Sequence, residues 1–258
     1  MMALADCTKH LIPQARGSGA IKVIGLGGIG GPVARYLGQF AASGAVPGLD
    51  RLVLIDGDSF EPGNTVRMFF RKCGNKAAVL REELHEYFAD SPLTILAMEA
   101  FVTRENIQDL IQEGDIVILA VDNHRTRKLV SDHFGSRLRD ACLISAGNDP
   151  AGPDSTGRIL RGTYGNCQSY IRRHGQNVTP SLTCHHPEIE HPTDIAPNEK
   201  SCIESISASP QILFTNLTAA TCVLSAFYRY LCWLNDFPEV AFDIADALMR
   251  PVSYSAAP

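Results

Sequence analysis

The residues best suited to chemistry gather in one short stretch, VLIDGDSFEPGNTVRMFF, at positions 53–70. An apolar strand ends there in two acids, Asp56 and Asp58, and Asn64 and Arg67 follow soon after. A carboxylate at the end of a parallel strand can accept hydrogen bonds from ribose hydroxyls. Asparagine and arginine side chains can donate to phosphates. The stretch therefore indicates a nucleotide site whose chemistry involves the phosphates.

A glycine-rich turn, GLGGIGG, lies upstream at positions 25–31. It follows an apolar strand and opens a helix, so its backbone N–H groups can approach a phosphate. The glycines expected to shape the nucleotide site are Gly25, Gly27, Gly28 and Gly30. A merely tight strand-to-helix turn is the alternative, but the acid at the end of the next strand favours the nucleotide site.

Basic residues decide which nucleotide the pattern favours. Arg67, Arg71, Lys72 and Lys76 all follow Asp56 within twenty residues. A triphosphate carries more charge than a dinucleotide and needs such donors, whereas hydride transfer does not, so the pattern favours ATP over NAD. Arg71 and Lys72 are also consistent with a solvated surface, and Asp58 with a plain turn residue.

The elements that must position these side chains alternate between strand and helix. The pattern predicts a doubly wound, Rossmann-like α/β sheet that is parallel in its first half and covered by helices on both faces. The expected strands are 21–24, 51–56, 93–102, 115–121 and 141–147, and the expected helices are 30–42, 75–91, 104–114 and 124–138.

The pattern changes after Gly147. A loop with a hairpin, a long loop over 176–206, an apolar helix over 209–234 and a closing strand or hairpin form the expected mixed C-terminal extension. Ser209 and Pro210 suit the N-cap and first position of that helix. We expect one domain over 1–258, with a nucleotide-binding half (1–147) and a partner-binding half (148–258) joined by this long crossover-type loop.

Five motifs in order carry a family resemblance: GLGGIGG, LIDGD, NTVR, GNK and VDNHRTR, between Ile21 and Arg127. Together they resemble the ThiF/MoeB/ubiquitin-activating-enzyme (E1-like) superfamily. The segment NTVRMFF is similar to the activating enzyme of the modifier UFM and to bacterial ThiF-family proteins. The match after position 127 is looser.

The resemblance implies an adenylyltransferase that uses ATP and magnesium to activate the C-terminal glycine of a ubiquitin-like or sulfur-carrier protein. It implies phosphate contacts for Asn64, Arg67 and Lys76, and the ribose contact for Asp56. Asp122, after a predicted strand, would hold the magnesium ion, and Asn123 would lie near the adenine or phosphates. An N-cap role is the alternative for Asp122.

Many relatives transfer the activated modifier to a cysteine and then to a conjugating enzyme. The resemblance gives this role to Cys202, which precedes the long helix; a partly buried structural thiol is the alternative. Cys73, Cys142, Cys222 and Cys232 are expected to be packing residues.

Relatives often hold a structural zinc with two C-x-x-C pairs, which this chain lacks. Cys184, the nearby histidines and Cys202 have irregular spacing, so zinc is not expected. The resemblance allows a homodimer, although no N-terminal arginine motif is recognisable and Arg16 is a poor substitute. Met68 replaces the glutamine common after N-x-x-R.

Composition and charge restrict the class of protein and the cellular compartment. A formal net charge of −5 argues against a general nucleic-acid binder. No apolar run is long enough for a membrane span, and the N-terminal residues lack a signal-peptide core. Eight cysteines without a C-x-x-C pair then favour a reduced, cytoplasmic protein. The rival functions are an NAD-binding oxidoreductase and a non-catalytic scaffold with the same fold.

Overall fold

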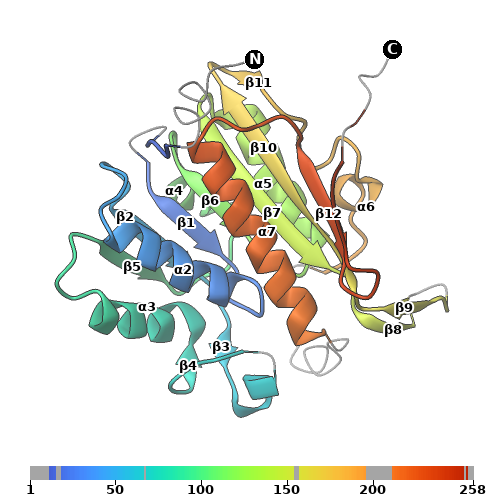
Figure 1. The fold of residues 1–258 in the computed structure, drawn as a ribbon, viewed down its shortest axis with the longest axis horizontal. Helices are drawn as coiled ribbons and strands as arrows, with labels where there is room; N and C mark the ends of the chain where they lie inside the picture. The colour runs from blue at the N-terminus through green and yellow to red at the C-terminus, as the bar shows by residue number, and fades with distance from the viewer. Residues whose placement is uncertain are drawn as a thin grey trace, which may run out of the picture.

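The computed structural model describes residues 12–15, 19–66, 68–153, 157–195, 211–252 and 254. Its described part is built on one large sheet with the strand order β13-β12-β10-β7-β6-β1-β2-β5, and β11 pairs with β10 beside this path (Figure 1). The mixed α/β architecture with a largely parallel first half agrees with the predicted fold class.

The first half of the sheet is parallel, as the pairings of β5 with β2, β2 with β1, β1 with β6 and β6 with β7 show. The chain runs outward from β1 to β2 and β5, and then crosses back to place β6 on the other side of β1. Such a reversal leaves a crevice at the carboxyl ends of the central strands. The strands are β1 (Ile21–Ile24), β2 (Arg51–Ile55), β5 (Thr94–Met98), β6 (Ile116–Leu119) and β7 (Ala141–Asn148).

The second half of the sheet is antiparallel. β10 pairs with β7 on one side and with β12 on the other, and β12 forms a hairpin with β13. Two small sheets, β3 with β4 and β8 with β9, lie outside the large one. The bounds are β3 (Ser59–Phe60), β4 (Gly74–Asn75), β8 (Ala151–Pro153), β9 (Ile159–Arg161), β10 (Tyr164–Arg173), β11 (Gln176–Asn177), β12 (Glu239–Asp243) and β13 (Leu248–Val252), with the 3-10 helix η1 at Pro62–Val66.

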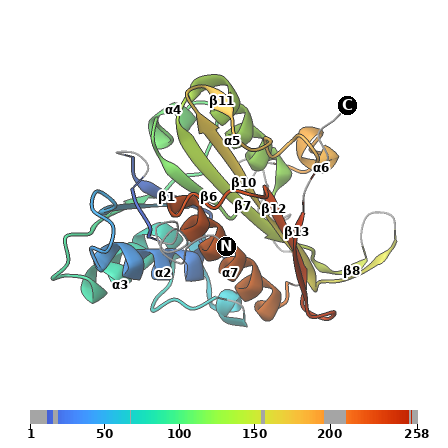
Figure 2. The same cartoon turned by 45° about the horizontal axis from the view of Figure 1, so that its top comes forward.

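Helices cover both faces of the sheet. Figure 2 shows α2, α3 and α7 below the sheet and α4 and α5 above it, and α6 packs beside α5. The alternating side chains of β6 explain this arrangement. Ile116 and Ile118 belong to the hydrophobic core between the sheet and α7, whereas Val117 and Leu119 belong to the core between the sheet and α5. The helices are α2 (Gly30–Ala42), α3 (Lys76–Tyr87), α4 (Ile107–Leu110), α5 (His124–Arg137), α6 (Pro187–Glu190) and α7 (Leu213–Leu231).

Three sequence-based expectations need correction. The stretch 176–206 is not a plain loop, because its described part contains β11 and α6, with Leu182 and Ile189 buried. The helix expected over 209–234 is described from Leu213, and the N-cap and proline assigned at 209 and 210 lie outside the described residues. Cys73 is exposed rather than packed, whereas the other three cysteines assigned to packing are buried.

No helix of the described part is long and apolar enough to cross a membrane.

Candidate functional site

A cleft of about 690 Å³ opens where the central strands end. Its walls include the residues that follow β1, β2, β6 and β7, so it lies at the crevice that the strand order creates. Of the predicted site residues, Gly25, Gly27, Gly28, Asp56, Asp58, Lys76, Asp122 and Asn123 line this cleft. Gly30 and Asn64 are not among its lining residues, and Arg67 and Cys202 lie outside the described residues.

The glycine turn is shaped by close backbone approaches. Gly25 has a φ of +84°, and a Cβ there would lie 2.8 Å from the carbonyl oxygen of Ala120. A Cβ on Gly30 would lie 1.8 Å from the carbonyl oxygen of Gly25, so this glycine lets α2 begin directly against the turn. A Cβ on Gly27 would meet no atom within 4 Å, which leaves its side of the turn open for a ligand. Gly30 therefore supports the turn, while Gly27 faces the cleft.

Asp56 ties the second strand to this turn. Its Oδ2 accepts a hydrogen bond from the Leu26 N–H at 2.6 Å, and its Oδ1 accepts one from the Asp58 N–H at 2.8 Å. Burial raises the pKa of Asp56, and the nearby Lys76 opposes that rise. Each carboxylate oxygen has a second lone pair, so ribose hydroxyls can still donate to Asp56 while the turn stays fixed.

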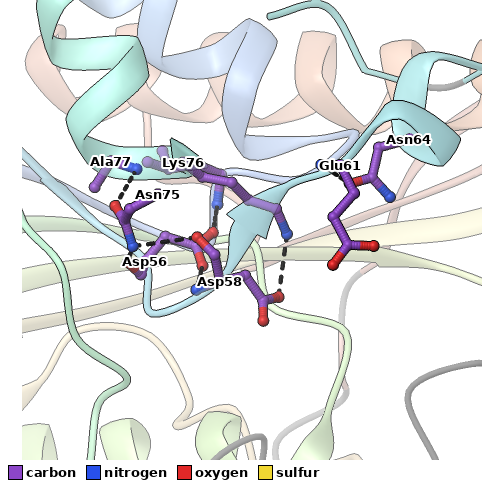
Figure 3. Close-up of polar contacts among 8 residues, drawn as sticks. Asp56, Asp58, Glu61, Asn64, Asn75, Lys76 and Ala77 are labelled. Atoms are coloured by element: carbon purple, nitrogen blue, oxygen red, sulfur yellow. Dashed lines mark hydrogen bonds and ion pairs between the residues drawn. The ribbon is translucent and has the colours of Figure 1, made fainter. Parts of the chain in front are cut away.

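Lys76 reaches the same end of the cleft from the start of α3. The side chain is buried, and its Nζ lies 3.1 Å from Oδ2 of the largely exposed Asp58 (Figure 3). Asp58 is thus the counter-ion of Lys76, and the turn role considered from the sequence does not describe it fully. A buried ammonium beside the glycine turn is placed to attract phosphate oxygens.

Asn75 holds Lys76 in place, a role that the sequence reasoning missed. Its Oδ1 accepts from the N–H groups of Ala77 and Ala78, and its Nδ2 donates to the Asp56 carbonyl at 2.9 Å (Figure 3). Asparagine is a preferred N-cap, so the sequence NKAAVL carried this signal. The cap connects the end of β2 with the start of α3.

The other polar residues after Asp58 lie away from this network. Asn64 accepts from the Glu61 N–H at 3.0 Å, a contact that shares no residue with the Asp56–Lys76 network (Figure 3). Arg71 and Lys72 form exposed ion pairs with Glu86 and Glu82 of α3, which fits the surface interpretation. Met68 does line the cleft. The phosphate role of Asn64 stays a prediction.

Asp122 and Asn123 follow β6, and the two side chains have different roles. Asp122 is exposed in the cleft, whereas Asn123 is buried and caps α5 through its Oδ1, which accepts from the Thr126 N–H at 2.8 Å. The N-cap role considered for Asp122 therefore belongs to Asn123. Asp194 adds a second cap, because its carboxylate accepts from the N–H groups of His124 and Arg125. Asp122 keeps its carboxylate available to a ligand.

Residues that were not predicted form the opposite end of the cleft. Asp149, Tyr164 and Asn166 come from the β7–β10 connection and β10, and His186 and Glu188 from the region of α6. They are up to 39 positions apart and belong to no motif, so only the antiparallel pairing and α6 bring them together. We call this group the acidic end, and Gly25, Gly27, Gly28, Asp56, Asp58 and Lys76 the nucleotide end.

His186 is the centre of a hydrogen-bond network at the acidic end. Its Nδ1 lies 2.9 Å from Glu188 and its Nε2 lies 2.9 Å from Glu239, which also accepts from Tyr254 and from Asn166. Burial alone would lower the pKa of His186, but the two glutamates outweigh it and raise the pKa. The same contacts lower the pKa of Glu239 against its own burial.

Arg127 lines the cleft between its two ends. It is buried, and its Nη2 donates to the carbonyl oxygens of Val121 and Ala146, both at 2.9 Å. Burial lowers its pKa and the nearby Asp122 opposes this. The guanidinium therefore links the ends of β6 and β7.

A metal site made of protein side chains alone is absent from the described residues, where no group of three or more His, Cys, Asp or Glu is suitably arranged. Both ring nitrogens of His186 contact glutamates, which removes it from the set considered for zinc. A single exposed carboxylate such as Asp122 still suits magnesium, because Mg²⁺ is usually held by one or two carboxylates together with phosphates and water.

Comparisons with known proteins agree with this architecture. The model of the ThiF family matches residues 9–233. The structure of E. coli MccB with ATP has a TM-score of 0.66 at 15% identity over 97% of this chain and 67% of that one. The structure of E. coli MccB with AMPCPP and MccA has a TM-score of 0.65 at 16% identity, over 99% of this chain and 68% of that one. The structure of PaaA has a TM-score of 0.61 at 17% identity, over 91% of this chain and 64% of that one. At such identities the likeness concerns the fold, and no curated protein matches the chain.

Proposed function

The chain belongs to the ThiF family, and we propose that it is an adenylyltransferase that uses ATP to activate the C-terminal carboxylate of a peptide or protein. One observation carries the proposal: Asp56, Lys76 and Asp122 line a single cleft beside the glycine turn. A ribose acceptor, a buried cation and an open carboxylate are the groups that ATP with a metal ion needs. MccB, which shares the fold, was crystallised with ATP and with MccA.

The proposed reaction places the ribose against Asp56 and the phosphates between the glycine turn and Lys76. An oxygen of the substrate carboxylate attacks the α-phosphorus, the bond to the bridging oxygen breaks, and pyrophosphate leaves. Lys76, and Arg67 as predicted from the sequence, offset the charge that develops on the phosphate oxygens. Magnesium bound at Asp122 would supply further charge neutralisation there.

The partner in this proposal is a ubiquitin-like or sulfur-carrier protein, as the sequence resemblance implies. Transfer of the activated carboxylate to Cys202 and then to a conjugating enzyme would be a second step, and a homodimer the assembled form. Both extend the proposal beyond adenylation. They are tested separately, by a reducible adduct that is lost in Cys202→Ala and by the mass of the protein in solution.

Pyrophosphate exchange into ATP, driven by a ubiquitin-fold protein ending in glycine, tests the first step. We expect Asp122→Ala to lower the exchange rate by about a hundredfold or more. The variant lacks the carboxylate that would hold the magnesium ion, so the negative charge on the phosphates is neutralised less well. Asp132→Ala is the matched control, since Asp132 lies on α5 in an exposed pair with Lys128. An Asp122→Ala variant with the exchange rate of the control would contradict the assigned role.

An NAD-binding oxidoreductase is the second candidate, and the ribose contact of Asp56 would serve it equally well. Lys76 argues against it, because hydride transfer has no need of a buried cation beside the glycine turn. NADH binding without any exchange activity would favour this candidate.

A further inference from the structure

The start of α5 already holds a carboxylate. Asp194, which follows α6 in the chain, accepts hydrogen bonds from the His124 N–H and, at 3.1 Å, from the Arg125 N–H. The first N–H groups of a helix have no partner within the helix, and together with the helix dipole they bind anions. This helix start also faces the cleft, because His124 is among the lining residues. A carboxylate of the protein itself therefore sits on an anion site next to Asp122.

Two buried donors at the same helix start have no partner among the described residues. They are Nδ2 of Asn123, a residue that is 2% exposed, and Nε of Arg127, a residue that is 6% exposed. Asn123 directly precedes the two N–H groups that hold Asp194, Arg127 lies about one turn further along α5, and both line the cleft. Buried donors are nearly always paired in proteins. These two point to a ligand that brings acceptor oxygens.

The charges at this place favour an anion. The buried Arg127 guanidinium donates to two backbone carbonyls, and no carboxylate of the described residues forms an ion pair with it. Burial lowers the pKa of Arg127, and the carboxylates of Asp122, Asp194 and Glu188 oppose this. Glu188 is paired with His186, and the charge of Asp122 would be offset by the magnesium ion proposed there. Asp194 is the remaining acid, and it is the one seated on the helix start.

We propose that the start of α5 binds the C-terminal carboxylate of the substrate, and that Asp194 occupies this site until the substrate arrives. The inference rests on the proposed function, because the site and the nucleotide end share one cleft. The substrate carboxylate displaces Asp194 and takes over its two N–H donors. Its oxygens also accept from Nδ2 of Asn123 and Nε of Arg127, which Asp194 leaves without a partner.

This exchange of carboxylates would serve the proposed reaction in two ways. A carboxylate fixed on the helix start is held in one orientation beside Asp122, which favours attack on the α-phosphorus. The internal competitor also lowers the apparent affinity of every carboxylate by the fraction of molecules in which the site is open. Small acids without further contacts to the protein are then excluded, whereas a substrate with such contacts can displace Asp194.

Two small peptides test the site: acetyl-Gly-Gly, which ends in a carboxylate, and acetyl-Gly-Gly-amide, which does not. Each is titrated by calorimetry into the full chain, with and without AMPCPP and magnesium. Asp194→Ala removes the competitor, so we expect acetyl-Gly-Gly to bind about tenfold more tightly than to the wild type, with no gain for the amide. Glu190→Ala is the control, because Glu190 is an exposed acid of α6 that is not among the lining residues.

Two further variants separate the competition from a loss of structure. Asp194→Asn keeps an acceptor for the cap without the charge, so it should give a smaller gain for acetyl-Gly-Gly, and an unchanged AMPCPP affinity shows that the cleft is folded. Adding Asn123→Asp to Asp194→Ala should abolish the gain, because aspartate still caps α5 but lacks the Nδ2 donor and repels a carboxylate.

Three results would overturn the site: no gain for acetyl-Gly-Gly in either Asp194 variant, an equal gain for the acid and the amide, or a gain that survives Asn123→Asp. The outcome is distinguishable from a failure of the proposed function. A chain that binds AMPCPP but shows no gain refutes the carboxylate site alone. A chain that shows the gain without binding AMPCPP refutes adenylation and leaves the carboxylate site in place.

Discussion

The two ends of the cleft are built in opposite ways. The nucleotide end comes from a continuous part of the chain between Gly25 and Lys76, and its charged groups are paired with one another or with backbone. The acidic end comes from residues spread between Asp149 and Glu188, and its histidine is held between Glu188 and the more distant Glu239. The first end is therefore built by local sequence, whereas the second depends on tertiary contacts between distant parts of the chain.

This difference teaches where specificity resides in the molecule. A site that serves one constant nucleotide can be fixed in advance, because its ligand never changes. A site that selects a partner needs groups that are satisfied only by the right ligand. We therefore expect substitutions at the nucleotide end to affect all substrates alike, and those at the acidic end to change the choice among substrates.

Among substitutions at the two ends, Lys76→Met should produce the largest effect. Removing the buried cation should lower the exchange rate by about a hundredfold and do so for every substrate, because the lost charge acts on the phosphates. Lys72→Met is the matched control, since Lys72 forms an exposed ion pair with Glu82, which lies on the same helix as Lys76. Exchange kinetics with two different substrates measure both. An effect that depends on the substrate would contradict the division between the two ends.

Gly28→Ala should have an intermediate effect, on stability. The added Cβ would lie 2.2 Å from Nδ2 of the buried Asn216, so we expect a loss of about 1–3 kcal/mol in the free energy of unfolding. Adding Asn216→Ala should recover part of that loss through a coupling of about 0.5–3 kcal/mol.

Gly27→Ala is the neighbouring control. Its Cβ would meet no protein atom within 4 Å, so stability should change by less than about 0.5 kcal/mol, while ATP binding weakens where the methyl group faces the phosphates. Denaturant titrations and calorimetry separate the two variants. Equal destabilisation by both would show that the turn is not shaped as the structure has it.

His186→Gln should have the smallest effect, and a pH-dependent one. The folded pKa of His186 is raised, so its contribution is complete below the ordinary histidine pKa of about 6.5 and is lost as the pH rises through the raised value. The folded pKa of Glu239 is lowered, so its contribution is present above about 4.3 and is lost as the pH falls through the lowered value.

The difference in unfolding free energy between wild type and His186→Gln should therefore be largest between about pH 4.3 and about pH 6.5, near 1–2 kcal/mol, and shrink above that window. His191→Gln is the control and should give only a small difference, because the His191 side chain is largely exposed. A His186→Gln difference that stays constant up to about pH 9 would refute the charged network.

Sequence reasoning reached the nucleotide end because its signals are local. The helix predicted over 30–42 has the same bounds in the structure, and the strand predicted over 51–56 differs by one residue. Glycine spacing, an acid after a strand and a helix start are each read within a few residues. The N-cap role considered as the alternative for Asp122 belongs to Asn123, because only the geometry shows that Asn123 accepts from the Thr126 N–H.

The acidic end could not be reached in this way. Strand β10 mixes polar residues such as Asn166 and Gln168 with buried Cys167 and Tyr170, and it was not predicted as a separate strand; its position depends on pairing with both β7 and β12. Helix α6 is too short for any periodicity. His186 meets Glu239 from 53 positions away, a contact that tertiary structure alone creates.

Competition between nucleotides tests the central claim most directly. The full chain is titrated with ATP in magnesium-containing buffer, and NADH is then added at increasing concentration. We predict saturable binding of ATP that NADH does not displace, because Lys76 and Asp122 favour a triphosphate with its metal ion over a dinucleotide. Tight NADH binding that displaces ATP, or no binding of ATP at all, would contradict an adenylyltransferase site in this cleft.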